Sequence, residues 1–431
     1  MAKQRPIAVI AGARTPFIKS FTDLQNVSAV DLGRTALLGA VQRAGLTPEE
    51  IDEVVIGNVA GPPDAANVAR VIALKSGIPI DKIAHTVNRN CASGMESIIA
   101  GWQAIESGRA EIVVAGGSES MSGIPLLYSS EAAAAWMKLG RSKTVVQRLR
   151  SLTSFRPRHF KPIIGIELGL TDPVSGLNMG ETAELLAHEF GVSRAQQDRF
   201  AMQSHHKAEA AQVACFLSGE IAAVERGPAD LVDKDNGPRY GQSMQQLAKL
   251  RPLFSSDGTV TAGNSCPLTD GAAAVVLADP EHCGRFAGSP QGYVTAYAIA
   301  GCAPSRMGLG PVYATAKLLK QTGMSLSDFD LFEINEAFAA QVLACQKAFA
   351  SRAFAERELS MSTALGEIPT DRLNVHGGAI ALGHPVGSTG TRMILTLLRS
   401  LKASGKRLGL ATLCVGGGQG VAMVVQSNLG E

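Results

Sequence analysis

The stretches SGMESIIAGWQAIESGRAEIVVAGGSE (93–119) and TGTRMILTLLRSLKASGKRLGLATLCVGGG (389–418) follow one plan. Each begins with a small residue and a glycine and continues through an apolar helical stretch to a Ser-Gly step. Each then passes a basic turn and ends in an apolar strand and a glycine cluster. A repeat of this kind predicts one supersecondary unit used twice. We therefore expect a duplicated fold, with one copy near each end of the chain.

Other short apolar runs flanked by glycine have the same strand-like character and predict strands buried on both faces. These runs are 7–12, 54–61, 112–117, 272–279 and 408–418. Between them lie amphipathic helices. After Cys91, apolar residues recur at helical spacing, at Met95, Ile98, Ile99, Trp102 and Ile105. Strands alternating with helices predict a layered α/β architecture.

The bulk composition sets the limits on function. The 431 residues are 45% hydrophobic and 18% charged, as in a globular chain of two or three domains. A net charge of +2 gives no electrostatic case for nucleic acid as a partner. The 7 cysteines include no C-x-x-C pair and indicate a reducing compartment rather than a zinc or redox motif. With no signal-peptide h-region and no long apolar run, we expect a soluble, cytoplasmic protein.

Three separate stretches contain candidate reactive groups. Cys91 lies just before a predicted helix, where the helix dipole and free N–H groups would lower the pKa of a thiol; an inert buried thiol is the alternative. His384, in a glycine-rich loop, stands in the second copy roughly where Cys91 stands in the first, so a Cys–His pair is plausible. Cys414 runs into three glycines, which let backbone N–H groups approach a ligand as an oxyanion hole requires. Asn335 opens a helix after a short strand, where its side chain can reach a pocket.

The motifs resemble those of the thiolase family over essentially the whole chain. They are RTPF (14–17), NRNCASGMES (88–97), VVAGGSESMS (113–122), DGTVTAGNS (257–265), NEAFA (335–339), GGAIALGHPVGSTG (377–390) and CVGGG (414–418). The resemblance implies two duplicated α/β halves that form a layered α-β-α-β-α core with an inserted loop domain. We expect residues 1–121 and 250–285 in the first half, 122–249 in the loop domain and 286–431 in the second half.

The resemblance also implies a role for each motif residue. Cys91 would be the nucleophile that carries the acyl group, and His384 would take its proton. Cys414 would be the second acid/base, and Asn335 would position a water in one oxyanion hole. The backbone N–H groups of Cys91 and Gly416 would form another. No metal and no permanently bound cofactor are implied, because coenzyme A enters as a substrate.

The implied activity is thiolysis of a 3-oxoacyl-CoA in fatty-acid β-oxidation. Two alternatives remain: a biosynthetic acetyl-CoA acetyltransferase, and a non-catalytic acyl-CoA-binding protein of the same fold. For coenzyme A contacts the resemblance points to Arg239, Gln246, Gly263 and Cys266, although many thiolases have serines in place of Gln246 and Cys266. Arg239 is equally consistent with an exposed loop residue.

Residues 132–166 contain eight Lys and Arg residues and no acidic residue, interleaved with apolar ones. This segment is similar to one in the β-subunit of the trifunctional fatty-acid oxidation complex, although Asn335 stands where those subunits typically have histidine. The similarity implies a hydratase/dehydrogenase α-subunit as a partner. The composition also suits peripheral contact with an anionic membrane, and a solvated loop is the alternative. We further expect a homo-oligomer, a dimer or a tetramer.

Overall fold

A computed structural model describes residues 5–227, 230–286 and 288–430. Its main feature is a 10-stranded sheet in the order β12-β13-β14-β11-β1-β10-β5-β3-β4, with β2 paired to β10. The strands are β1 (Ile7–Arg14), β2 (Ile18–Lys19), β3 (Glu53–Gly57), β4 (Ile83–Val87), β5 (Ile112–Glu119), β10 (Thr269–Ala278), β11 (Gly292–Gly301), β12 (Leu331–Ile334), β13 (Leu408–Val415) and β14 (Gln419–Gln426).

The sheet consists of two similar arrangements joined by the antiparallel pair β1–β11. In the first, β3 is parallel to β5, β5 is antiparallel to β10, and β10 is antiparallel to β1. In the second, β12, β13, β14 and β11 repeat these relations in the same order. An isolated parallel bridge between Phe332 and Leu373 takes the place that β4 has beside β3. The matching topology agrees with the duplication predicted from the sequence.

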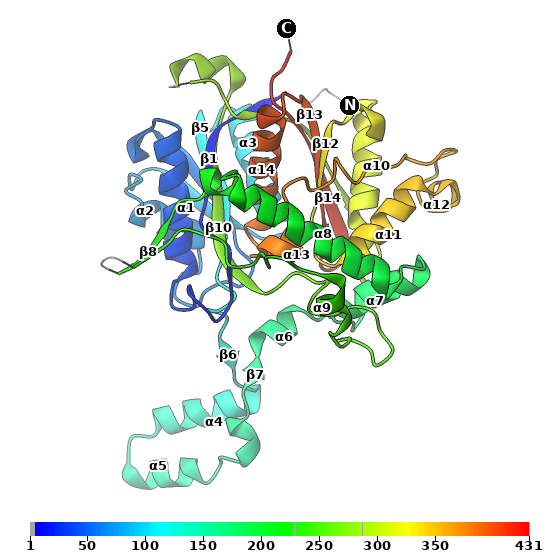
Figure 1. The fold of residues 1–431 in the computed structure, drawn as a ribbon. Coiled ribbons are helices and arrows are strands. Elements are labelled where there is room, and N and C mark those ends of the chain that lie inside the picture. The colour runs from blue at the N-terminus through cyan, green and yellow to red at the C-terminus, as the bar shows by residue number, and fades with distance from the viewer. Residues whose placement is uncertain (1–4, 228–229, 287, 431) are drawn as a thin grey trace. The chain divides into compact units, whose positions relative to one another are not determined.

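The helices pack against these strands in separate apolar clusters. They are α1 (Ala29–Arg43), α2 (Val68–Lys75), α3 (Ser93–Glu106), α7 (Met179–Glu189), α8 (Arg194–Val213), α9 (Met244–Ala248), α10 (Gly310–Thr322), α11 (Ala339–Ala350), α12 (Arg352–Glu358), α13 (Ala379–Leu382) and α14 (Thr389–Ala403). The helices α1 and α2 cover one face of the first half, and α10 and α11 cover one face of the second. Between the two sets of strands, α3 and α14 share a third cluster (Figure 1). The layers therefore alternate helix, sheet, helix, sheet, helix, as expected.

Glycines at the crossing of α3 and α14 explain why the repeat begins with a small residue and a glycine. A Cβ on Gly94 would lie 2.7 Å from the Thr391 nitrogen, and one on Gly390 would lie 2.6 Å from the Met95 nitrogen. The Thr391 hydroxyl donates to the Gly94 carbonyl oxygen at 3.0 Å. The crossing brings the amino ends of the two helices together, and with them the loops that contain Cys91 and His384.

Residues 172–249, part of the expected loop domain, pack with the sheet rather than apart from it. The chain divides into one compact unit of residues 1–123 and 172–431 and a second of residues 124–171. In the larger unit the buried Arg14 pairs with Glu220 at 2.9 Å and with Asp235 at 2.7 Å, which fixes this segment to the end of β1. The division into two duplicated halves and a loop domain at the predicted boundaries stays a prediction.

The smaller unit, residues 124–171, is a helical hairpin with a short two-stranded sheet at its base. Its elements are β6 (Leu126–Leu127), α4 (Ser130–Arg141), α5 (Val145–Leu152), β7 (Ile163–Ile164) and α6 (Gly165–Gly169). Trp136 packs edge-on against Phe155, with ring centroids 4.8 Å apart. Within the described residues, no helix is both long and apolar enough to cross a membrane.

Candidate active site

A tight turn places Cys91 two residues ahead of α3. Asn90 has φ of 44°, the left-handed region that asparagine tolerates better than most residues. The Ser93 hydroxyl accepts from the Arg89 N–H at 2.9 Å and donates to the Asn90 carbonyl oxygen at 2.7 Å. These bonds tie the turn to the first residue of the helix, so the thiol has a fixed position at the helix start.

The Cys91 turn contacts the glycine cluster that follows β13. The Asn90 side-chain amide donates to the Gly416 carbonyl oxygen at 2.7 Å. The N–H groups of Gly416 and of Cys91 itself donate toward the thiol and lower its pKa, but burial has the larger effect and raises the pKa above its ordinary value. The lowered pKa expected from the helix dipole was therefore wrong. The thiol is protonated at rest, and forming the thiolate requires a base.

His384 lies in the glycine-rich loop before α14, with a buried imidazole. Its Nδ1 is 2.6 Å from the Thr389 hydroxyl oxygen, whereas its Nε2 is buried without a hydrogen-bond partner in the structure. Burial, with a smaller contribution from the Arg392 charge, lowers the pKa of His384 to about 4. The imidazole is therefore neutral near pH 7, with one nitrogen oriented by Thr389 and the other free to accept a proton.

Asn335 lies at the end of β12, and its side chain is similarly unpartnered. Its amide oxygen and nitrogen are both buried without a hydrogen-bond partner in the structure. Its backbone N–H donates to the Thr412 carbonyl oxygen at 3.1 Å, which places it beside β13, the strand that contains Cys414. Buried polar groups are nearly always hydrogen-bonded in proteins. An amide left in this state is suited to holding a water or a ligand.

Glu336, the neighbour of Asn335, ties β12 to α13, the helix that leads directly into the glycine-rich loop of His384 (383–388, the histidine loop). Its carboxylate accepts from the Ser204 hydroxyl at 2.6 Å, from the Asn374 side-chain amide at 2.8 Å and from the Ile380 N–H at 3.2 Å. Asn335 and the loop of His384 are consequently held in a fixed relation.

Cys414 is the last but one residue of β13 and is buried. Burial raises the pKa of its thiol well above the ordinary value, and the neighbouring Cys91 thiol raises it further. The side chain packs in an apolar cluster with Ala337 and Phe338, next to Asn335 in the chain. A protonated thiol beside a second thiol can donate a proton to a carbanion or an enolate.

The residues predicted to contact coenzyme A fall into two groups. Cys266 donates its backbone N–H to the Ala337 carbonyl oxygen at 3.0 Å, and burial followed by the Cys91 charge raises the pKa of its thiol to about 12. It therefore lies with the reactive thiols. Gly263 is buried on the same segment, and a Cβ there would meet the Leu247 side chain of α9. Gln246, also on α9, is exposed and caps that helix by accepting from the Ser243 N–H at 3.0 Å.

Arg239 belongs to a separate basic group. Its backbone N–H donates to His205 Nδ1 at 3.2 Å, and its charge helps to lower the pKa of His205, after burial, to about 4. The same charge, again after burial, lowers the pKa of Lys19. The side chain of Arg239 is exposed, as in the loop alternative, and lies in a basic environment that would attract phosphate.

The structure adds residues that sequence reasoning did not assign. Thr389 orients His384, Asn90 joins the cysteine turn to Gly416, and Glu119 joins strand β5 to the histidine loop. All three occur in the motifs quoted above, but nothing in the sequence indicates which polar side chains of a motif point inward.

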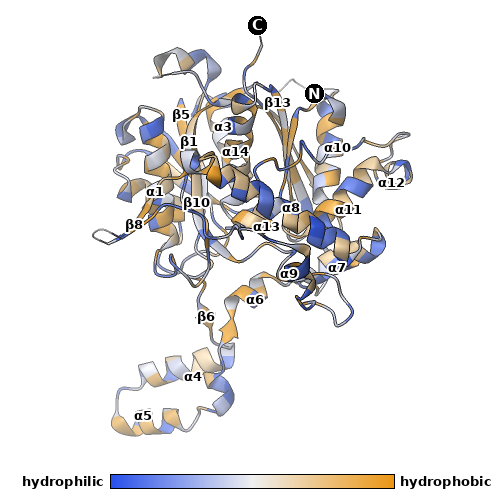
Figure 2. Cartoon of the chain, viewed as in Figure 1, coloured by the Kyte–Doolittle hydropathy of each residue, from blue (hydrophilic) through white to orange (hydrophobic). Residues whose placement is uncertain are grey.

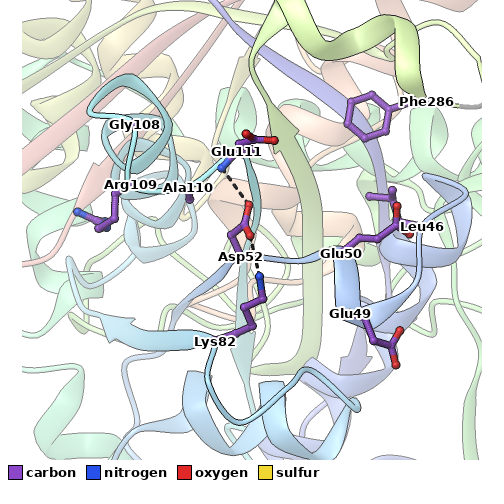
Figure 3. Close-up of a pocket in the computed structure, with 10 residues that line it drawn as sticks. All are labelled: Leu46, Glu49, Glu50, Asp52, Lys82, Gly108, Arg109, Ala110, Glu111 and Phe286. Atoms are coloured by element: carbon purple, nitrogen blue, oxygen red, sulfur yellow. Dashed lines mark hydrogen bonds and ion pairs between the residues drawn. The ribbon is translucent and has the colours of Figure 1, made fainter.

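A polar pocket of about 630 Å³ lies elsewhere, at the opposite end of β3 and β5 from the histidine loop (Figure 3). In it Asp52 accepts from Lys82 at 2.9 Å and from the Glu111 N–H at 3.0 Å. None of the predicted site residues lines this pocket. The predicted reactive residues Cys91 and His384 lie instead just before the amino ends of α3 and α14.

A duplicated α/β fold that brings two thiols and a neutral buried histidine together is typical of an acyltransferase. Residues 7–281 match the family described as "Thiolase, N-terminal domain", and residues 289–427 match "Thiolase, C-terminal domain". The chain belongs to the thiolase family, which confirms the predicted resemblance and fold class.

Individual relatives are similar over almost their full length. The chain is 39% identical to a 3-ketoacyl-CoA thiolase of Shewanella baltica over 428 residues, covering 99% of this chain and 98% of the relative. It is also 39% identical to a 3-ketoacyl-CoA thiolase of Yersinia enterocolitica, covering 97% and 96%.

Two solved structures are similarly close. A Bacillus anthracis acetyl-CoA acetyltransferase superposes with a TM-score of 0.85 at 35% identity, covering 99% of this chain and 100% of the other. Human mitochondrial 3-ketoacyl-CoA thiolase in complex with CoA superposes with a TM-score of 0.84 at 36% identity, covering 99% of each chain.

Proposed function

We propose that this acyltransferase cleaves 3-oxoacyl-CoA with coenzyme A, giving acetyl-CoA and a shortened acyl-CoA in fatty-acid β-oxidation. The observation that carries the proposal is the meeting of Cys91, the Gly416 N–H group and Cys414, beside a loop that presents the free Nε2 of a neutral His384. The 3-ketoacyl-CoA thiolases at 39% identity support this choice of substrate.

In the first half-reaction, His384 takes the proton of Cys91 and the thiolate attacks the C3 ketone. The C2–C3 bond breaks, leaving an acyl group on Cys91 and the enolate of acetyl-CoA, which is protonated by Cys414. A neutral histidine and a protonated thiol are the forms that these two steps require. Asn335, through a bound water, and His384 stabilise the thioester oxygen of the leaving enolate.

In the second half-reaction, coenzyme A enters and gives its thiol proton to Cys414. The coenzyme A thiolate attacks the acyl-Cys91 thioester, whose oxygen accepts from the N–H groups of Cys91 and Gly416. The C–S bond to Cys91 breaks, the shortened acyl-CoA is released, and the Cys91 thiolate takes back its proton from His384. The raised pKa of Cys414 suits exchange of a proton with another thiol, because acid and base are then closely matched.

A panel of thiolysis rates against acyl length tests the substrate. We expect turnover of medium- and long-chain 3-oxoacyl-CoA at least comparable to that of acetoacetyl-CoA. Rapid acetoacetyl-CoA cleavage with negligible long-chain turnover would instead support the second candidate, a biosynthetic acetyl-CoA acetyltransferase. The similarity to the Bacillus anthracis acetyl-CoA acetyltransferase is the observation that favours this candidate.

For coenzyme A recognition we propose contacts with two parts of the ligand, the pantetheine arm and the phosphates. Gly263 and Cys266, with Gln246 on α9, border the pantetheine arm that must reach Cys91. Arg239 and Lys19 form a basic group that attracts the phosphates of coenzyme A. Arg239→Gln should raise KM for coenzyme A severalfold and leave kcat unchanged, whereas an unchanged KM would assign Arg239 to the exposed loop alone.

We further propose that the basic segment 132–166, within the hairpin of residues 124–171, makes peripheral contact with an anionic membrane. Val145 and Val146 on α5 are 72% and 75% exposed, and Leu149 is exposed one turn further along. In Figure 2 the hydrophobic colour follows much of α5. Basic and apolar side chains together suit such a surface.

Vesicle sedimentation tests this contact. Wild-type protein should sediment with phosphatidylserine vesicles and not with phosphatidylcholine vesicles, and Val146→Asp should abolish sedimentation at unchanged thiolysis. Equal sedimentation by both proteins would contradict the proposal. The proposed hydratase/dehydrogenase α-subunit is tested separately, by copurification of that activity with the tagged chain from its own host.

Oligomerisation is proposed from the edge of the sheet. Strand β4 is an outer strand of the 10-stranded sheet, and Ile83 on it is 50% exposed. An uncovered, apolar edge strand is a template for pairing with another chain. We propose a homodimer, or a tetramer built from it, that uses this edge.

A further inference from the structure

We infer that Glu119 is a positioning residue that fixes the histidine loop of the second half against the half that contains Cys91. Its carboxylate Oε2 accepts from the Gly387 N–H at 2.9 Å, and Gly387 lies three residues after His384. The same carboxylate accepts from the Val59 and Ala60 N–H groups at 3.1 Å and 2.9 Å. One side chain therefore binds the loop after β3 and the loop before α14 together.

Close packing at the same place makes the contact restrictive. A Cβ on Gly117 would overlap the Gly387 carbonyl oxygen, and one on Gly387 would lie 2.8 Å from the Gly57 carbonyl oxygen. The histidine loop thus lies directly on the carboxyl ends of β3 and β5. Glu119 ends β5 and is fully buried, so its own position is fixed by that strand.

The chemistry of the contact calls for a carboxylate in particular. The Asn58 side-chain amide donates to Oε1 at 3.1 Å, so the carboxylate faces N–H donors on both oxygens. Burial raises the pKa of Glu119 to about 7, and the N–H donors of Val59, Ala60 and Gly387 act in the opposite direction. A glutamine would direct its own NH₂ group at some of those donors, because an amide accepts through only one of its two atoms.

Glu119 differs from Glu336 in what it connects. Glu336 holds α13, just before the histidine loop, to β12 within the second half. Glu119 belongs to the first half, as does Cys91. Its bond to the histidine loop therefore helps to set the distance between Cys91 and His384. A displacement of about 1 Å between reacting groups can lower a rate about a hundredfold.

The test compares Glu119→Gln with a matched control, Glu53→Gln. Glu53 is a second buried glutamate of the first half, at the opposite end of β3, where it binds Arg109 at 2.9 Å and does not touch the histidine loop. Thiolysis is measured at about pH 8, above the pKa of Glu119, with the melting temperature of each variant. Alkylation of Cys91 by iodoacetamide gives a readout that is independent of turnover.

We expect Glu119→Gln to lower kcat about tenfold to a hundredfold with little change in KM. Alkylation is compared in Glu119→Asp, which keeps the charge that raises the Cys91 pKa, and should be slower than in wild type. Glu53→Gln should lower the melting temperature and leave kcat and alkylation unchanged. Glu119→Asp, which keeps the charge on a shorter stem, serves if Glu119→Gln does not fold and should also lower kcat. Unchanged kcat and alkylation in a folded Glu119 variant would overturn the inference.

The inference rests on the proposed function, since it takes His384 as the base for Cys91. The two fail differently. A wild-type protein without thiolysis would contradict the proposed function, whereas an active wild type that is matched by its Glu119 variants would contradict only the role of Glu119.

Discussion

At the scale of single residues, burial rather than the helix dipole sets the protonation of the reactive groups. Burial keeps the thiols of Cys91 and Cys414 protonated and the imidazole of His384 neutral. These three groups are uncharged at rest, and the proposed mechanism forms a Cys91 thiolate and a His384 imidazolium only when the substrate arrives. The thiols then have separable roles, the nucleophile and the proton donor.

The separate roles predict a specific defect in Cys414→Ala. Without the proton donor, thiolysis should fall about 10²- to 10⁴-fold, the usual contribution of general acid–base catalysis. Alkylation of Cys91 by iodoacetamide should continue. Steady-state thiolysis and mass spectrometry of the alkylated protein measure the two. Cys302→Ala, at a partly buried thiol outside the predicted site, is the control, and full activity in Cys414→Ala would refute the role.

A second residue-scale prediction concerns His376 and acid stability. Its ring stacks on Phe216 with centroids 3.7 Å apart, and burial, then the Arg399 charge, lowers its pKa to about 4. The ordinary histidine pKa is about 6.5. As the pH falls from 6.5 toward 4, the unfolded chain takes up a proton that the folded chain refuses, so stability is lost in that window.

His376→Asn removes this loss. The unfolding free energy of wild type relative to the variant should decline by about 1–2 kcal/mol between about pH 7 and pH 4.5, an amount reduced for the partial exposure of the ring. Urea unfolding at each pH measures it, and the other titrating groups cancel because both proteins share them. A pH-independent difference would show that the His376 pKa is not lowered.

At the scale of elements, the crossing of α3 and α14 determines how the two halves meet. Gly94 and Gly390 allow the backbones of the two helices to approach closely. The loop that contains Cys91 leads into α3, and the loop that contains His384 leads into α14. A substitution at the crossing therefore acts on the fold and on the site at once.

Gly94→Ala tests the crossing. The added Cβ would lie 2.7 Å from the Thr391 nitrogen, so one helix has to shift. We expect a loss of about 1–3 kcal/mol in unfolding free energy, as in other overpacked cores, together with reduced thiolysis. Gly284→Ala is the control, since a Cβ there meets none of the described residues within 4 Å. Equal melting temperatures and activities for the two variants would contradict the role of the crossing.

The same elements explain how far the sequence alone could lead. Fully buried strands such as β5 and β13 are visible as continuous apolar runs, and the echo around Gly94 and Gly390 predicts the duplication. The bond between Glu119 and Gly387 and the bond between Glu336 and Ile380 were not visible, because they join residues 268 and 44 positions apart, respectively. The pKa of Cys91 was missed because its burial depends on the whole site.

At the scale of the whole molecule, the proposed site draws its residues from both halves. Cys91 comes from the first half, and His384, Asn335 and Cys414 come from the second. The outer strand β4 contributes none of these residues and is the edge at which we propose pairing with a second chain.

A charge on β4 tests assembly. Ile83→Lys should convert the proposed dimer to a monomer, because a lysine on an edge strand opposes pairing with another strand. Light scattering after size-exclusion chromatography measures the mass. Val213→Lys, at an exposed residue at the end of α8, should leave the dimer intact. A wild-type monomer, or a dimer that survives Ile83→Lys, would contradict the use of this edge.

The central claim is that Cys91 accepts the acyl group in a site completed by His384 and Cys414. Its most direct test is mass spectrometry of the protein after brief incubation with a 3-oxoacyl-CoA and no free coenzyme A. The account predicts a mass increase equal to the shortened acyl group, mapped to the peptide containing Cys91, absent in Cys91→Ala and removed by added coenzyme A. An unmodified wild-type protein that nevertheless binds the substrate would identify a non-catalytic acyl-CoA-binding member of the family and contradict the account.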